Sequence, residues 1–135
     1  MRNAAEHGDL RAKFRLTEHY RFGDPTDQAK ARELLFELAE QGFPLAQVSL
    51  AELYCWGEGG VPRDHSLAFK WYRTAADQGY PEGIYHVGRC FFEGIGVPIN
   101  KTEARAWFAD AAARNHFNAR MFLSREDSKF FGWKF

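Results

Sequence analysis

The feature of this sequence that most constrains its fold is an internal repeat. The segment Ala39-Glu-Gln-Gly42 recurs as Ala76-Asp-Gln-Gly79, and weaker copies begin at Ala5 and Ala112. The copies lie 34 to 37 residues apart, which is the period of stacked helix-turn-helix units. We therefore expect one domain, residues 1–135, that is divided into units of approximately 5–38, 39–75, 76–111 and a partial, capping unit 112–135.

Each unit carries two apolar stripes with helical spacing. In the second unit Ala46, Leu50 and Tyr54 recur every four residues, and a second stripe runs from Leu67 to Ala75 in steps of three and four. Each unit is thus predicted to be a hairpin of two helices, a helix A followed by a helix B. The fold class that follows is all-α, an α-solenoid of about three such units plus a C-terminal capping helix.

The segments between helix A and helix B are rich in glycine and proline. Residues 57–62 and 94–98 are expected to form these connections, because glycine permits positive φ and proline stops a helix from continuing. Asp64 and Asn100 then stand where the side chain of an N-cap residue is expected for helix B.

A specific pattern joins these positions. In the second unit it runs from Ala46 through the linker Gly57-x-Gly59-Gly60-Val61 to Trp71-Tyr72, and in the third it ends at Trp107-Phe108. This pattern resembles the Sel-1-like repeats, which belong to the tetratricopeptide-like α-solenoids. Plain tetratricopeptide repeats lack the Gly-x-Gly-Val linker, so the linker separates the two classes.

The first unit departs from this pattern. Its linker is the shorter Gly23-Asp24-Pro25-Thr26, and Leu34 replaces the tryptophan. We expect Trp71 and Trp107 in the other units to fill the contacts between repeats. The ends of the chain add two expectations: Arg2 to Ala5 match the last turn of a preceding helix B, and the aromatic segment 130–135 covers the open end of the solenoid or contacts a partner.

Charge and composition narrow the possible partners. Lysine and arginine together number 18 and so do aspartate and glutamate, so no basic excess favours a phosphate backbone and no nucleic acid partner is expected. No apolar run approaches the length of a membrane span. We expect a soluble protein that is cytoplasmic as written, or periplasmic or in a secretory lumen if an N-terminal leader has been removed.

Groups for catalysis or metal binding are sparse. The five histidines are scattered without a recognised catalytic motif, and His86 with Cys90, four residues apart, supplies only half of a tetrahedral metal site. Cys55 and Cys90 are expected to be free, largely buried thiols. The sequence predicts no enzyme, no cofactor and no metal.

A partner surface is then expected on helix A, which the resemblance places on the concave side of the solenoid. Its side chains outside the apolar stripe differ from unit to unit, as expected if neighbouring units contact different parts of one partner. These candidates are Arg15, Glu18, Phe22, Ser49, Glu52, Trp56, His86, Arg89, Glu93, Phe122 and Arg125.

The resemblance implies a non-catalytic module that binds another protein, as an adaptor or regulator. Among small bacterial members it also implies an immunity role, in which the module neutralises a secreted toxin effector by direct binding. The alternative is a protein that binds a small molecule or metal, or acts as a catalyst, in the groove around His86, Arg89 and Trp56.

Overall fold

The computed structural model describes residues 14–15, 25–58 and 60–130, with the backbone alone for Pro25 and residues 126–130. This part of the chain contains helices and no strand, which confirms the predicted all-α class. The helices are α2 (Pro25–Glu40), α3 (Pro44–Trp56), α4 (His65–Asp77), α5 (Pro81–Glu93), α6 (Lys101–Ala113) and α7 (Phe117–Phe130).

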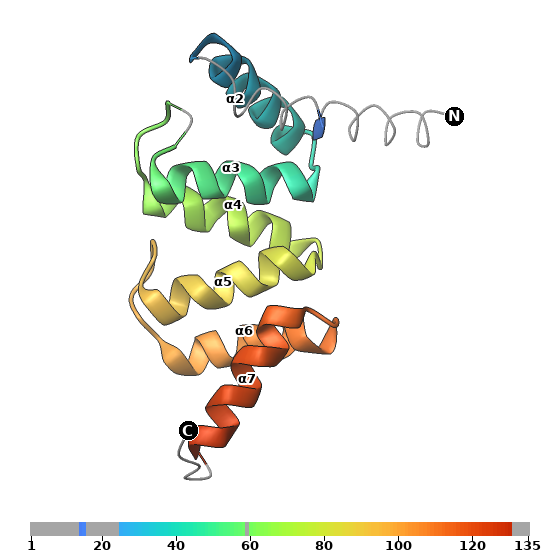
Figure 1. Cartoon of the computed structure of the whole chain (residues 1–135), viewed down its shortest axis with the longest axis vertical. Coiled ribbons are helices and arrows are strands. Elements are labelled where there is room, and N and C mark those ends of the chain that lie inside the picture. The colour runs from blue at the N-terminus through green and yellow to red at the C-terminus, as the bar shows by residue number, and fades with distance from the viewer. Residues whose placement is uncertain (1–13, 16–24, 59, 131–135) are drawn as a thin grey trace, which may run out of the picture.

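The helices stack in the order in which they occur in the sequence (Figure 1). Each of α2 to α6 packs against the next helix of the chain, and α3 also contacts α5 directly. Such nearest-neighbour packing defines a solenoid, in which each unit buries its apolar face against the adjacent unit. Because α3 and α5 are the helices A of successive units, their contact places the A helices side by side.

The predicted caps at the start of helix B are present. The carboxylate of Asp64 accepts a hydrogen bond from the backbone N–H of Leu67 at 3.1 Å, and the side-chain oxygen of Asn100 accepts one from Glu103 at 3.0 Å. Each bond satisfies one of the N–H groups that a helix start leaves without an intrahelical partner. Both sequence positions were therefore assigned correctly.

Helix A ends in the left-handed conformation that the linker glycines predict. Gly57 has φ 69° and Gly94 has φ 77°, values that a residue with a Cβ adopts only with strain. After α6, Asn115 adopts the left-handed conformation, with φ 67°. Asparagine tolerates the left-handed region better than most other non-glycine residues.

In the first unit, part of the predicted linker is helical. Pro25 and Thr26, which the sequence comparison placed in the connection, form the first turn of α2. Proline is favoured at the first helical position, since its missing N–H has no partner there and its fixed φ suits the helix. Gly23 and Asp24 lie outside the described residues, as do the N-terminal residues 2–5 and the aromatic residues 131–135.

Small residues bring neighbouring helices close together, both between units and within one unit. A Cβ added to Gly83 would lie 2.9 Å from the Cβ of Ala75, and one added to Gly88 would lie 2.8 Å from the ring of Phe108. Ala46 and Ala51 occupy the corresponding places on α3 and are fully buried. Larger side chains at these four positions would force the helices apart.

The aromatic residues that fill the contacts between repeats are not the ones expected. Tyr72 and Phe108 are 3% and 1% exposed, whereas Trp71 and Trp107 are only half-buried. The stripe that faces the neighbouring helices therefore lies one residue further along helix B. Trp107 instead packs at the rim, where the guanidinium of Arg73 lies 5.0 Å from the centre of its ring.

Candidate functional site

Candidate residues on α3 and α5 lie near one another. Trp56, at the C-terminal end of α3, is 53% exposed, Glu93 on α5 is exposed, and Ser49, Glu52 and Arg89 are half-buried. Oε1 of Glu52 on α3 lies 3.7 Å from Nε2 of His86 on α5, so the two helices approach each other along this face.

The remaining candidates lie toward the two ends of the chain. Arg15 and Arg125 are exposed, whereas Glu18 and Phe22 fall outside the described residues. We call the exposed and half-buried candidates of α3 and α5 the inner face, defined as Ser49, Glu52, Trp56, Arg89 and Glu93.

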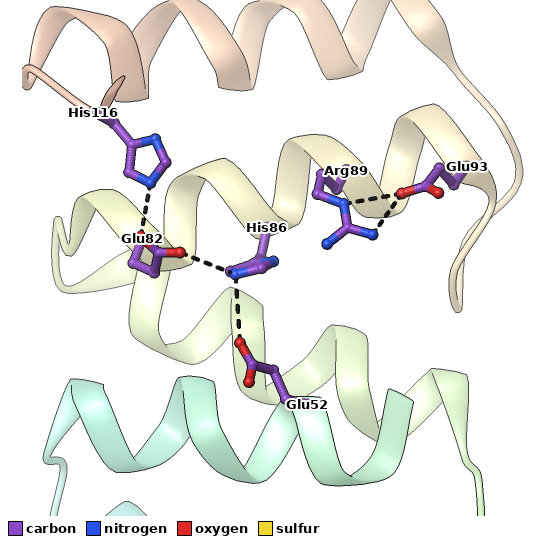
Figure 2. A network of polar contacts seen from close by, with 6 residues as sticks. All are labelled: Glu52, Glu82, His86, Arg89, Glu93 and His116. Atoms are coloured by element: carbon purple, nitrogen blue, oxygen red, sulfur yellow. Dashed lines mark hydrogen bonds and ion pairs between the residues drawn. The ribbon is translucent and has the colours of Figure 1, made fainter. Parts of the chain in front are cut away.

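Arg89 and Glu93 form the principal ion pair of the inner face. Both Nε and Nη2 of Arg89 lie 2.9 Å from Oε2 of Glu93, one turn further along α5 (Figure 2). Partial burial of Arg89 opposes its charge, but the carboxylate of Glu93 outweighs this effect and raises the pKa of Arg89. Arg89 therefore carries a fixed positive charge, held in place by its partner.

His86 is not an open groove side chain. It is 7% exposed, and its ring stacks on Tyr72 with centroids 4.6 Å apart and an interplanar angle of 15°. Its Nε2 lies 3.2 Å from Oε1 of Glu82 and 3.7 Å from Oε1 of Glu52. The expectation that His86 contacts a partner is corrected here, because this ring is used to join α3, α4 and α5.

The polar contacts continue from Glu82 to the next unit. Its other oxygen, Oε2, lies 2.7 Å from Nε2 of His116, which directly precedes α7 (Figure 2). The hydrogen bond from His86, helped by the one from His116, lowers the pKa of Glu82 to about 2 although burial opposes this. We call Glu52, Glu82, His86 and His116 the polar network; it spans three successive units.

Sequence reasoning found His86 and Glu52 but missed Glu82 and His116. The four-residue spacing of Glu82 and His86 on one helix was a usable signal, because residues at i and i+4 face each other. The link from Glu82 to His116 crosses 34 residues of sequence, and only the packing of α5 against the start of α7 reveals it.

Phe122 also differs from the expectation of an open contact residue. Its ring lies 5.1 Å from that of Phe92 and 4.3 Å from that of Phe108, measured between centroids, and it packs against the buried core. Phe122 thus attaches α7 to α5 and α6, and its half-buried ring leaves only part of the side chain open to a partner.

The two cysteines are poorly suited to act as nucleophiles, because their surroundings disfavour the thiolate form. Cys55 and Cys90 are both buried as free thiols, and burial raises the pKa of Cys55 and that of Cys90, the latter to about 12. A thiol at that pKa supplies almost no thiolate at neutral pH. Within the described part of the chain, no group of three or more His, Cys, Asp or Glu residues is arranged to hold a metal ion.

Two surface hollows lie away from the residues named for the small-molecule alternative. One of about 550 Å³ lies at the start of α3 and is lined by Phe14, Phe43 and Tyr80 among others, and one of about 470 Å³ lies at the start of α7. Neither is lined by His86, Arg89 or Trp56.

The fold and the inner face define a class, an α-solenoid built from two-helix repeats. The chain belongs to the Sel1 repeat family, whose model matches residues 10–43, 44–80 and 81–116. Each matched segment begins a few residues later than the unit boundaries chosen from the sequence. Proteins built from such repeats commonly mediate protein–protein interaction, and the fold is typically a non-catalytic scaffold.

Solved structures of Sel1 repeat proteins share this architecture. A Sel1 repeat protein from Oxalobacter formigenes is 35% identical, with a TM-score of 0.76 over 93% of this chain and 99% of the other. A protective antigen of uropathogenic Escherichia coli that displays an SLR fold is also 35% identical, with a TM-score of 0.79 over 95% of this chain and 28% of that protein. The predicted family and architecture are confirmed.

Curated relatives are much longer than this chain. Chitin synthase regulatory factor 3 of Schizosaccharomyces pombe is 30% identical over 129 residues, which are 93% of this chain but 14% of that protein. DAP3-binding cell death enhancer 1 of the mouse is 30% identical over 100 residues, 71% of this chain and 19% of the relative. The chain therefore spans less than a fifth of each of these two proteins.

Within the described residues, no helix is long and apolar enough to cross a membrane.

Proposed function

We propose that the chain is a non-catalytic module that binds a protein partner across its A helices. The observation that carries this proposal is Trp56, a large aromatic side chain at the C-terminal end of α3 that is 53% exposed. Tryptophan and arginine are enriched among the residues that dominate binding energy at protein interfaces. The exposed ring offers a partner apolar area, and the Arg89–Glu93 ion pair on α5 offers a charge pattern with a fixed orientation.

The proposed contact surface is wider than the inner face. It consists of the inner face together with Arg15 and Arg125, which are exposed, and with Glu18 and Phe22, which lie outside the described residues. His86 and Phe122 act beneath this surface, because they hold the helices that present it.

Two finer roles suit such a module. One is an adaptor or regulator, and the other is a small bacterial immunity protein that neutralises a secreted toxin effector. The name of the Schizosaccharomyces pombe relative, a regulatory factor, supports the first role, so we propose adaptor or regulator. If the captured partner is a secreted toxin, the immunity role would replace the role of adaptor or regulator.

The test begins with affinity capture from the source cell, using the whole chain as bait, followed by calorimetric titration of the captured partner. Trp56→Ala is expected to lose about 2 kcal/mol or more of binding free energy, while its melting temperature stays close to that of the wild type. Arg89→Glu is expected to weaken the same complex, with an effect that shrinks as salt is added.

A matched control is Lys70→Glu, a charge reversal on the exposed face of α4. It is expected to leave affinity unchanged, because this position lies outside the proposed contact surface. Unchanged binding in both Trp56→Ala and Arg89→Glu, with both variants folded, would rule out the inner face as the contact surface.

A further inference from the structure

His116 occupies a position with two simultaneous hydrogen bonds. Its Nδ1 accepts a bond from the backbone N–H of Ala119 at 3.2 Å, and its Nε2 lies 2.7 Å from Oε2 of Glu82. Its backbone carbonyl accepts from the N–H of Arg120 at 3.1 Å, the first bond of α7. By both contacts His116 is the N-cap residue of α7.

These partners determine where the proton of the ring resides. An N–H group can only donate, so Nδ1 must carry a free lone pair to accept from Ala119. The proton of the neutral ring is then on Nε2, from which it is donated to the carboxylate of Glu82. The carboxylate fixes the tautomer that the cap requires, and so Glu82 of the third unit positions the first turn of α7.

Adding a second proton to this ring has two opposed effects. The imidazolium is attracted to Glu82, but the new proton on Nδ1 faces the N–H of Ala119 and removes the cap. The positive charge also stands at the N-terminus of α7, where the helix dipole disfavours a cation. We propose that His116 is a pH-sensitive cap, which holds the first turn of α7 while neutral and releases it when protonated.

The surroundings of His116 leave this switch intact. Its side chain is 9% exposed, and its ring stacks on Tyr85 of α5 with centroids 4.5 Å apart. The other ionisable groups around it are Glu82 of α5, Tyr80 before α5, Arg114 at the end of α6, which pairs with Asp110, and Arg120 one turn along α7. Of these, Glu82 is the only acid bonded to the ring.

The release has a specific structural consequence. The start of α7 is held to α5 by His116, through Tyr85 and Glu82, while the middle of α7 is held by Phe122. Loss of the cap therefore loosens the first turn of α7, while the attraction to Glu82 keeps the ring of His116 on Tyr85 and Phe122 keeps the middle of the helix attached. The capping helix loosens at its N-terminal end when His116 is protonated.

The test uses the whole chain labelled with ¹⁵N. Near neutral pH, the ring nitrogens of His116 are expected to show a protonated Nε2 and an unprotonated Nδ1. As His116 titrates, the protection of the Ala119 amide against hydrogen exchange, corrected for the intrinsic pH dependence, is expected to fall about fivefold or more. That factor is the ordinary contribution of one helix cap expressed as an equilibrium constant.

Three variants separate the cap from other titrations. His116→Asn keeps a capping oxygen but does not titrate, so the protection of Ala119 should become flat over the same pH range. Glu82→Gln should weaken the preference for the ring proton on Nε2, because the carboxylate that accepts this proton is gone. His86→Gln should leave the fall in protection in place.

A proton on Nδ1 at neutral pH, or protection of Ala119 that stays constant while His116 titrates in the wild type, would overturn the proposal. The same fall in His116→Asn as in the wild type would also overturn it. The ring measurement needs no substitution, so the proposal stays open to refutation even if a variant does not fold.

Discussion

The ring of Phe108 occupies the space that a side chain at position 88 would need. A Cβ on Gly88 would lie 2.8 Å from two carbons of that ring, and Phe108 itself is 1% exposed. The two residues belong to α5 and α6, so this contact sets how closely the two helices of the third unit approach. Two substitutions test its contribution.

Phe108→Ala is expected to lower the free energy of unfolding by about 3–5 kcal/mol, as for other large side chains removed from a core. Trp107→Ala, its neighbour in sequence, is the matched control and is expected to have a clearly smaller effect, because Trp107 is half-buried. Urea denaturation of both variants provides the comparison. Equal losses would mean that the half-buried ring matters as much as the buried one.

Gly88→Ala is expected to destabilise the protein by about 1–3 kcal/mol, because the added methyl group must displace the ring of Phe108 or the backbone of α6. The double variant Gly88→Ala with Phe108→Leu should recover part of the loss if the ring is the obstacle. Thermal denaturation monitored by circular dichroism measures both. A single variant as stable as the wild type would show that α5 and α6 can move apart freely.

Gly94→Ala tests the left-handed end of α5. The residue has φ 77°, and an added Cβ would lie 2.9 Å from Cγ1 of Ile99, so we expect a loss of about 1 kcal/mol or more in unfolding free energy. Repeating the substitution in an Ile99→Ala background removes the contact and leaves only the backbone strain. If most of the loss then disappears, the contact rather than the φ angle accounts for it.

The buried thiols predict slow chemical modification. Burial raises the pKa of Cys90 to about 12 and also raises that of Cys55, so little thiolate is present at pH 7 to 8. A disulfide reagent such as 5,5′-dithiobis(2-nitrobenzoate) should react with both cysteines rapidly in urea and slowly in the folded protein. Fast labelling of Cys90 in the native state would contradict this burial.

Glu82 predicts how stability changes in acid. Its pKa is about 2 in the folded chain against an ordinary value of 4.5, so the unfolded chain binds the proton more readily between these values. The contribution of Glu82 is therefore fully present above about pH 5 and is lost as the pH falls toward 2. Its carboxylate is 43% exposed, and solvent screening reduces the size of this effect.

Urea denaturation between pH 2.5 and pH 6 measures this contribution. The stability of Glu82→Gln should vary less over that range than the stability of the wild type. Glu103→Gln, a substitution of an exposed acid on α6, serves as the control and should follow the wild-type curve. Parallel curves for wild type and Glu82→Gln would show that the pKa of Glu82 is not lowered by folding.

Local chemistry explains which features the sequence could predict. Asp64 and Gly94 each act within a few residues of their own position, through a cap or a backbone angle, and both were identified correctly. The periodicity of apolar residues likewise predicts the two-helix unit. It did not distinguish Trp71 from Tyr72, because adjacent residues on a helix differ by about 100° in direction and the orientation of the stripe is set by the neighbouring helices.

The candidate site was harder to predict, for a physical reason. Trp56 is recognisable because a large aromatic side chain outside the apolar stripe has no place in the core. His86 was assigned to the open groove because Glu52 and the stacked Tyr72, which cover it, belong to the preceding unit and cannot be read from the unit of His86. Contacts between units depend on the directions of individual side chains, and a repeat pattern, which shows only what the units share, does not give these directions.

The polar network has a consequence for how this chain could be rebuilt. In the preceding unit Leu45 and Ser49 stand at the places of Glu82 and His86, and Phe43 and Tyr80 stand at the place of His116. The junction before the third unit also contains Gln47, which donates a hydrogen bond to the carbonyl of Ala39 and accepts one from Gln78. The units are therefore not interchangeable. An extra copy of one unit inserted in the middle, or a consensus repeat averaged over all units, would preserve the helices but lose the polar contacts between units.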